Sequence, residues 1–262
     1  MRMLRCLMLL WVLVLGSQAA LAEEKPDCAR SLSLALHDHG LLYSTQTNEG
    51  IDKDLADELA RRSGCKLTVT VMPRARIWQL IESGGLDFSL SGITNEARDK
   101  FAGFAWYFSN KYYLLLRQDA GVKTIADFER NASLKLGAIR GFRYNPGANR
   151  LVDKLDTEQR VSFSNSLDPL YEVLLSQRIQ AMIIEPFDYP TVQRAAIRAQ
   201  TSILEFEDPP VPHGLIMSKK SLSPQQQEAW RALVKGMRAD GTVQRIFEKY
   251  FPAELARTLT QY

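Results

Sequence analysis

The chain has 262 residues, of which 45% are hydrophobic and 24% are charged. This length and composition are typical of one large or two modest globular domains. They exclude a disordered tail, a collagen-like fibre and a small disulfide-stapled protein. The 33 basic and 30 acidic residues leave a net charge of +3, which is too balanced and too scattered for a nucleic-acid-binding surface.

The N-terminal segment 1–22 indicates export. Arg2 and Arg5 precede a short apolar run, and small residues follow it at Ala20 and Ala22. This pattern predicts a secretory signal peptide that is cleaved after Ala22. A membrane anchor is the alternative, but the apolar run has only about half of the roughly 20 residues that a spanning helix needs. We therefore expect a soluble periplasmic protein.

The remainder of the chain alternates between strand and helix patterns. In chain order, the patterns predict a strand at 32–36, a helix from Ile51 that stops at Gly64, a half-buried strand at 67–71, a helix at 77–83, strands at 86–90, 112–116 and 134–139, a helix at 167–176, a strand at 181–184 and a helix from Pro224 to about Arg238. Such alternation favours an α/β fold with mainly parallel sheets.

Two cysteines remain after the predicted cleavage, Cys28 and Cys65. In an oxidising compartment we expect them to form a disulfide, because neither has the neighbours that a metal site or a nucleophile would need. Cys28 comes just before the first predicted strand and Cys65 just before the next. The starting ends of two strands in a βαβ unit are neighbours, so the pairing is consistent with the fold.

Several segments of the chain form a recognisable series. The first is Gly50-Ile-Asp-Lys-Asp-Leu-Ala-Asp-Glu-Leu-Ala60, and the others are 80–87, 91–94 with Arg98 and Phe104 beyond, 136–141, 175–180 and 241–251. Together they resemble, in the same order, the polar-amino-acid family of periplasmic solute-binding proteins. The resemblance implies a type II fold of two lobes that close on a small ligand for a membrane ABC importer. By the same resemblance, 23–115 and 209–262 form lobe 1 and 116–208 form lobe 2, with crossings at 112–117 and 209–213.

The resemblance also carries ligand-binding residues onto this chain. An arginine and a hydroxyl after the third strand hold the ligand carboxylate in the family, and Arg98 and Thr94 match them, with Gly92 in the same motif. The planar guanidinium suits a carboxylate because it donates two parallel hydrogen bonds. The loop between Thr94 and Arg98 is one residue shorter than is usual in the family. The alternative role of Arg98 is that of a solvated helix residue.

The family's partner for the ligand amino group is an acid at the end of a strand, where this chain has Glu185. A salt bridge to a neighbouring arginine is the alternative for Glu185. Four further positions match ligand-facing sites of the family or fall near them: Tyr43, Arg74, Arg143 and His37. Arg74 and Arg143 depart from the family pattern. Together with Arg98 they would make the cleft cationic and favour a ligand with more than one negative charge.

The pair His37 and His39 raises the question of a metal site, since alternate residues of a strand share a face. No third ligand accompanies them in the sequence, so we expect neither a metal nor a cofactor. The leading hypothesis is a monomeric binding protein that captures an amino acid or a related small carboxylate. One alternative is an enzyme similar to the periplasmic cyclohexadienyl dehydratases, with Glu185 or His37 as the proton donor. Another is a receptor that serves a membrane sensor kinase.

Overall fold

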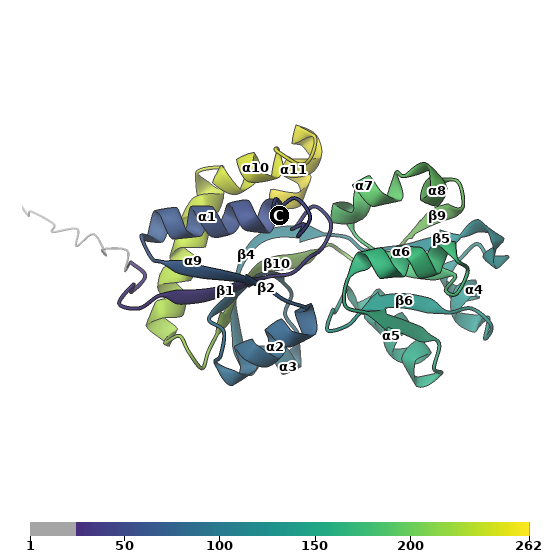
Figure 1. Ribbon diagram of the computed structural model, residues 1–262, viewed down its shortest axis with the longest axis horizontal. Helices are drawn as coiled ribbons and strands as arrows, with labels where there is room; N and C mark the ends of the chain where they lie inside the picture. Colours follow the sequence, from purple (N-terminus) through teal and green to yellow (C-terminus); the bar gives the residue numbers. More distant parts are fainter. Residues whose placement is uncertain (1–24, 262) are drawn as a thin grey trace, which may run out of the picture.

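The computed structural model describes residues 25–261. The predicted signal peptide therefore lies outside the described residues. The molecule consists of two lobes that lie side by side, each with a five-stranded mixed sheet covered by helices (Figure 1). Within residues 25–261, no helix is both long enough and apolar enough to cross a membrane. The predicted α/β fold with two lobes of type II is confirmed.

The first lobe contains the chain's beginning and its end. Its sheet has the order β2-β1-β3-β10-β4, in which β1, β2 and β3 are parallel and β10 is antiparallel to both β3 and β4. The strands are β1 (Leu32–Leu36), β2 (Leu67–Val71), β3 (Phe88–Gly92), β4 (Ala102–Asn110) and β10 (Val211–Ser218). The helices are α1 (Ile51–Ser63), α2 (Arg74–Ser83), α3 (Glu96–Asp99), α9 (Pro224–Ala239), α10 (Thr242–Phe247) and α11 (Ala253–Thr260).

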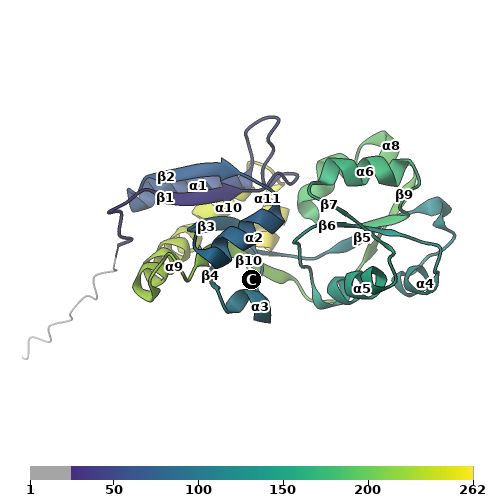
Figure 2. The ribbon, with the colours of Figure 1, turned by 60° about the horizontal axis from the view of Figure 1, so that its bottom comes forward.

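The second lobe is built from the middle of the chain. Its sheet has the order β7-β6-β8-β5-β9, with β6 parallel to β7 and β8, and with β5 antiparallel to β8 and β9. The strands are β5 (Tyr113–Arg117), β6 (Leu136–Ile139), β7 (Val161–Ser164), β8 (Ala181–Ile184) and β9 (Thr201–Glu205). The helices are α4 (Ile125–Arg130), α5 (Pro146–Thr157), α6 (Leu167–Leu175), α7 (Tyr189–Val192), α8 (Ala195–Arg198), and the short 3-10 helices η1 (Gln118–Ala120) and η2 (Pro186–Asp188). Figure 2 shows α5 and α6 on opposite faces of this sheet.

The chain passes between the lobes twice, from β4 to β5 and from β9 to β10. The first passage is at 111–112, because Tyr113 already pairs with Ile184 in the second sheet. The predicted lobe boundary at 115/116 thus falls inside β5. The second passage lies at 206–210, which includes the predicted boundary at 208/209. Val211 pairs with Asn110, so the predicted crossing at 209–213 extends into β10.

Local signals explain most of the helix ends. Gly64 ends α1 with a φ of 73° and donates its N–H to the carbonyl of Ala60, which is the left-handed cap that glycine favours. Ser223 begins α9 by accepting the N–H of Gln226, and proline occupies the first turn. These two helices were predicted correctly. The predicted helix at 77–83 begins earlier, at Arg74, and the predicted strand at 86–90 lies at Phe88–Gly92.

The prediction of a half-buried strand at 67–71 was wrong about burial. Residues 68–71 are all exposed, including Val69 and Val71 at 39% and 44%. The physical reason is position, since β2 is an edge strand that pairs with β1 alone. Alternation of apolar residues indicates a strand but does not reveal whether a helix covers it.

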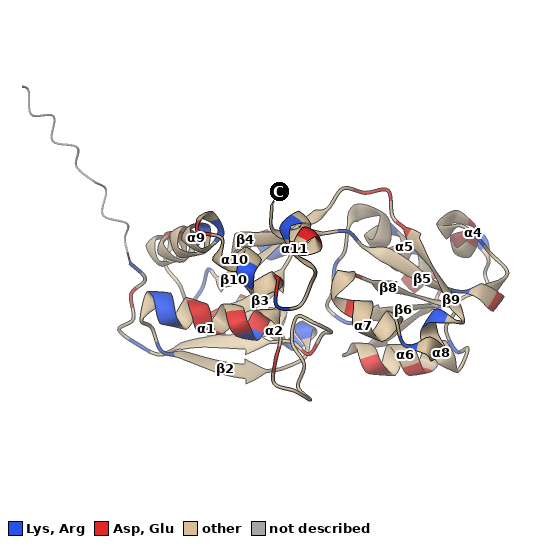
Figure 3. Ribbon diagram, turned by 90° about the horizontal axis from the view of Figure 1, so that it is seen from above, with Lys and Arg blue, Asp and Glu red and all other residues tan. Residues whose placement is uncertain are grey.

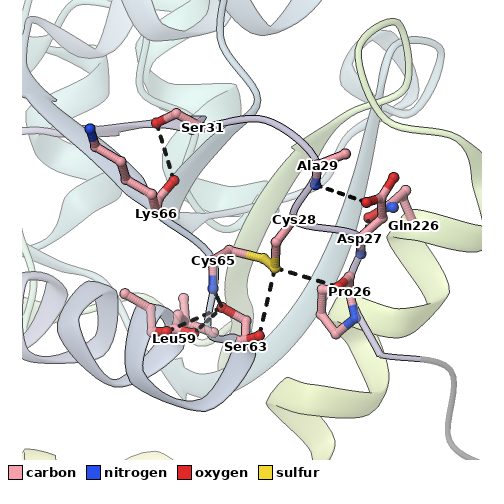
Figure 4. The surroundings of a disulfide bond; sticks show 11 residues. Pro26, Asp27, Cys28, Ala29, Ser31, Leu59, Ser63, Cys65, Lys66 and Gln226 are labelled. Atoms are coloured by element: carbon pink, nitrogen blue, oxygen red, sulfur yellow. Dashed lines mark hydrogen bonds between the residues drawn. A yellow bond between two sulfur atoms is a disulfide. The ribbon is translucent and has the colours of Figure 1, made fainter.

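The predicted disulfide is confirmed. Cys28 and Cys65 are bonded with their Cα atoms 4.9 Å apart, and the bond joins the segment before β1 to the segment before β2 (Figure 4). Because β1 and β2 are parallel, this bond lies at the starting end of both strands. The residues of the candidate site considered below follow the other ends of β1 and β3, so the disulfide and the candidate site occupy opposite ends of the sheet.

Candidate functional site

A cavity lies between the two lobes. The space between its lining atoms is about 310 Å³ with open solvent included, of which about 20 Å³ is wide enough for a water molecule. From the first lobe the cavity is lined by Leu42, Arg74, Trp78, Ser91, Gly92, Ile93, Arg98 and His213. From the first passage between the lobes and from the second lobe it is lined by Tyr112, Gly141, Phe142, Arg143 and Glu185. Several of these residues follow the carboxyl ends of parallel strands, which is where open α/β sheets bind ligands.

Arg98 is held at the cavity by four contacts. Asn95 caps α3 by accepting the Arg98 N–H at 2.9 Å, and the guanidinium lies 3.8 Å from the ring centre of Trp78, a favourable cation–π position. Its Nη1 donates to the carbonyl of Ile93 at 2.9 Å, and its Nη2 donates across the lobes to Gly141 at 2.8 Å. Burial and the charge of Arg74 lower the pKa of Arg98 to about 9.

Gly141 is required where Arg98 meets the second lobe. It has a φ of 81°, in the left-handed region that favours glycine. A Cβ atom there would come within 2.7 Å of the Cα of Ala75 in α2. The glycine therefore lets the loop after β6 approach the first lobe closely enough for its carbonyl to accept from Arg98.

Arg74 is the second buried arginine at the cavity, with only 4% of its surface exposed. Its Nη1 donates to the carbonyl of Leu90 at 2.9 Å, and its Cζ lies 5.5 Å from the ring centre of Phe142. Burial lowers the pKa of Arg74. The acid that acts on it most strongly is Asp52, whose Oδ1 accepts from Ser91 Oγ at 2.6 Å. Burial raises the pKa of Asp52 to about 6.

Neither Arg74 nor Arg98 forms an ion pair with an acidic side chain among residues 25–261. Two buried cations without acidic partners are costly, because burial removes the water that stabilises each charge. An anion that enters the cavity would offset this cost.

Glu185 lies on the opposite wall, just after β8, and both of its carboxylate oxygens have partners. Its Oε1 is 2.7 Å from His39 Nε2, and its Oε2 accepts from Asn110 Nδ2 at 3.0 Å. Burial raises the pKa of Glu185, but the hydrogen bond and charge of His39 outweigh burial, so the pKa is lowered. Burial in turn lowers the pKa of His39, and the bond to Glu185 with the nearby Asp188 raises it overall. The two groups therefore form a charged pair across the lobes.

The other expected site residues are divided between the cavity and its surroundings. Gly92 lines the cavity, and a Cβ there would lie 2.3 Å from Ile216. Arg143 also lines it, but its side chain is 41% exposed and pairs with Asp153 at 2.6 Å. Arg143 thus lies at the rim, while Arg74 and Arg98 lie inside.

Three expected ligand contacts do not reach the cavity. Thr94 is exposed and its hydroxyl donates to Asp99. The Tyr43 ring packs in the core of the first lobe, where its hydroxyl donates to Asn48 at 3.0 Å, and Leu42 lines the cavity in its place. His37 is buried with its ring centre 5.4 Å from that of Phe142. Burial and the charge of Arg74 lower the pKa of His37 well below 6.5, so it is neutral.

Several cavity residues were missed by the sequence analysis. His213 donates from Nδ1 to the carbonyl of Val211 at 2.8 Å, so its Nε2 accepts from the hydroxyl of Tyr112, also at 2.8 Å. Trp78, which also lines the cavity, was seen only as part of a helix. His39, which does not line the cavity but bonds to Glu185 beside it, was seen only as a metal candidate. No cluster of histidine, cysteine and acidic residues suited to a metal occurs within residues 25–261.

Comparison with protein families gives a match to "bacterial extracellular solute-binding proteins, family 3" over residues 39–253. The chain belongs to this family. A curated relative is the arginine-binding extracellular protein ArtP of Bacillus subtilis (strain 168), which is 27% identical over 142 residues that span 52% of each chain. The aligned part of this solute-binding protein thus corresponds to about half the length of that relative.

Solved structures share the fold over nearly the whole described chain. An ancestral arginine-binding protein bound to arginine superposes with a TM-score of 0.71 at 20% identity, covering 86% of this chain and all of the other. The ancestral amino acid-binding protein AncCDT-1, a precursor of cyclohexadienyl dehydratase, gives a TM-score of 0.67 at 20% identity, covering 84% of this chain and 95% of the other. At these identities the likeness concerns the fold alone.

Proposed function

We propose that this protein captures a small solute with a carboxylate group, an amino acid or a close relative of one, and presents it to a membrane ABC importer. In this proposal the solute binds in the cavity between the lobes, with Arg98 as its main anchor. The protein acts as a monomer in the periplasm after removal of the segment 1–22. The amino-acid-binding relatives and the secretory pattern of the N-terminal sequence support this assignment.

One observation carries the proposal most strongly. Arg98 and Arg74 are buried at a cavity between two lobes, and neither pairs with an acidic side chain among the described residues. A carboxylate accepts two parallel hydrogen bonds from a guanidinium, and the interaction is strengthened where water is excluded. Trp78 and Gly141 already fix the orientation of Arg98, so little side-chain entropy remains to be lost when a carboxylate binds.

A thermal-shift screen of the mature protein against amino acids and small carboxylic acids tests the proposal. A ligand present at about 100 times its Kd stabilises the folded protein by about 2.7 kcal/mol, which is readily measured as a rise in Tm. Calorimetric titration then gives the affinity of each hit. Failure of every amino acid and carboxylic acid to raise the Tm would refute the proposal.

The dehydratase alternative needs a protonated group to protonate the leaving hydroxyl. Glu185 does not suit that role, because its lowered pKa keeps it ionised and His39 and Asn110 occupy its oxygens. His37, the other nominated donor, is neutral and does not line the cavity. Incubation with prephenate or arogenate provides the check: we expect no aromatic product, and turnover would replace the transport assignment.

A further inference from the structure

We infer that the ligand of this cavity is a short dicarboxylate without an ammonium group, preferred over the corresponding α-amino acid. The inference rests on the proposed function and narrows its ligand class. It follows from a difference between the cavity's charged walls: the arginines of the first lobe lack acidic partners among the described residues, whereas the one lining carboxylate, Glu185, is already engaged.

The first step concerns the group that would receive a ligand ammonium. Among the described residues that line the cavity, Glu185 is the only acidic one. Its Oε1 is 2.7 Å from His39 and its Oε2 is 3.0 Å from Asn110. His39 and Glu185 are both buried, with 3% and 6% of their surfaces exposed. An ammonium at Glu185 would either displace His39 or share the carboxylate with it, and sharing places two cations together in a buried site.

The second step concerns the groups that would receive a second carboxylate. Arg74, Arg98 and Arg143 all line the cavity, and within residues 25–261 only Arg143 of these three has an acidic partner, Asp153. Arg74 directs Nη1 toward Leu90. Burial lowers the pKa of Arg74, the nearby acids Asp52 and Glu185 raise it without forming an ion pair with Arg74, and Asp52 does not line the cavity. A ligand with two carboxylates can therefore neutralise Arg98 with one end and Arg74 with the other. A zwitterion neutralises one arginine and brings a further positive charge.

The third step concerns size. The space in the cavity that a water-sized molecule can occupy is only about 20 Å³, far below the roughly 300–1,000 Å³ that ligand pockets span, so the lobes must separate to admit a ligand. Trp78, Tyr112 and Phe142 form apolar walls around it. A cavity this tight, with these walls, favours a compact ligand such as a short methylene chain between two carboxylates over a ligand with a long or highly branched side chain.

Matched ligands test the inference in the wild-type protein. Calorimetric titrations compare succinate with aspartate and glutarate with glutamate, since each pair differs only by the ammonium group. We expect the better diacid to bind roughly tenfold or more tightly than its amino acid. Equal or tighter binding of the amino acid would overturn the inference and leave the proposed function intact. No binding by any amino acid or carboxylic acid would instead overturn the proposed function.

Two variants locate the effect. In Arg74→Ala, the affinity for succinate should fall to the affinity of the same variant for butyrate. Butyrate is the matched control ligand because it lacks the second carboxylate. His39→Ala frees Glu185 and should narrow the gap between succinate and aspartate. Circular dichroism establishes whether each variant is folded. If a variant is not folded, the wild-type titrations still decide whether the diacid is preferred over its amino acid. Two results in folded variants would contradict the roles assigned to the two walls. One is a ratio of succinate affinity to butyrate affinity in Arg74→Ala that equals the wild-type ratio. The other is a ratio of succinate affinity to aspartate affinity in His39→Ala that equals the wild-type ratio.

Discussion

The buried charges that the two lobes contribute to the cavity are of opposite sign, and they differ in their partners. The first lobe contributes Arg74 and Arg98, which are held by carbonyl oxygens and aromatic rings and have no acidic partner among residues 25–261. The second lobe contributes Glu185, whose oxygens are bonded to His39 and Asn110. A charge that the protein has already paired contributes to closing the lobes, whereas an unpaired charge remains for a ligand.

Charged residues elsewhere do not show this contrast. Figure 3 shows lysine, arginine, aspartate and glutamate interspersed over both lobes. Many of them form ion pairs with an exposed partner, such as Arg61 with Glu58 and Arg130 with Asp127. Exposed pairs of this kind contribute little to stability. Several charges buried outside the cavity have an oppositely charged partner, among them Arg117, Arg160 and Asp87. The cavity is therefore distinguished by buried arginines without an acidic partner among residues 25–261, and variants that alter its charges test the comparison between its walls.

The largest effect is expected from removing Arg98. Arg98→Ala should weaken ligand binding by about 2–5 kcal/mol, because it strands a carboxylate in a buried site. Arg98→Lys should recover only part of the affinity, since an ammonium cannot donate two parallel bonds. Calorimetric titration measures both variants, with the exposed Arg257→Ala as a control. Unchanged affinity in Arg98→Ala would remove the central residue of the site.

Breaking the disulfide tests whether one end of the first sheet affects the stability of the fold without affecting ligand affinity at the other end. Cys65→Ser should lower the free energy of unfolding by about 2–4 kcal/mol, because the lost bond closes a long loop of the unfolded chain. Ligand affinity should stay the same, since the bond lies at the opposite end of β1 from the cavity. Chemical denaturation and titration report the two quantities. Equal stability of the oxidised and the reduced protein would count against a structural role for the bond.

A smaller effect is expected from the pair of His39 and Glu185, which joins the two lobes and should weaken as pH rises. His39 faces Glu185 and Asp188 across the boundary and Arg74 in its own lobe. The pKa of His39 in the folded protein is raised above 6.5. Protonated His39 therefore stabilises the closed lobes fully below about pH 6.5, and this stabilisation is lost as pH rises through the raised pKa. Glu185, with its pKa lowered from 4.5, contributes above about 4.5 and loses its contribution only as pH falls through the lowered value.

Small-angle X-ray scattering of the ligand-free protein measures how far the two lobes are closed. The radius of gyration should increase between about pH 6 and about pH 9, as His39 loses its proton and the lobes separate. His39→Ala should be expanded at both values and should respond little to pH. A wild-type radius that does not change over this range would show that the pair does not control closure.

The smallest effect is expected at the rim. Arg143→Ala should change the equilibrium affinity by less than about 1 kcal/mol, because the side chain is 41% exposed and already paired with Asp153. It should mainly reduce the association rate and the dependence of that rate on salt. Stopped-flow binding at low and high ionic strength separates the two. A loss of affinity as large as that of Arg98→Ala would place Arg143 inside the site.

The fold was largely predictable because its signals are local. Gly64 and Ser223 mark helix ends, and the order of strand and helix patterns indicates the α/β layers. The exposure of Val69 and Val71 was not predictable, because an edge strand and a covered strand have the same alternation. The first passage between the lobes was misplaced by a few residues, since Tyr113 and its neighbours are equally apolar in either sheet.

The site was predictable only where a short motif defines it. Arg98 follows its strand within one motif, and the cavity contains it. Thr94 belongs to the same motif, but Asn95 caps α3 and Thr94 faces Asp99 instead. The bond between His39 and Glu185 joins residues 146 positions apart, so no local pattern reveals it. Because of that bond, we propose that Glu185 acts as a closing contact and not as an ammonium partner.

A crystal structure with the tightest ligand from the screen tests the central claim most directly. The account predicts electron density for the ligand between the lobes, with one carboxylate accepting two hydrogen bonds from Arg98 and the pair of His39 with Glu185 intact. Density outside the cavity, or a ligand whose carboxylate does not contact Arg98, would contradict the account.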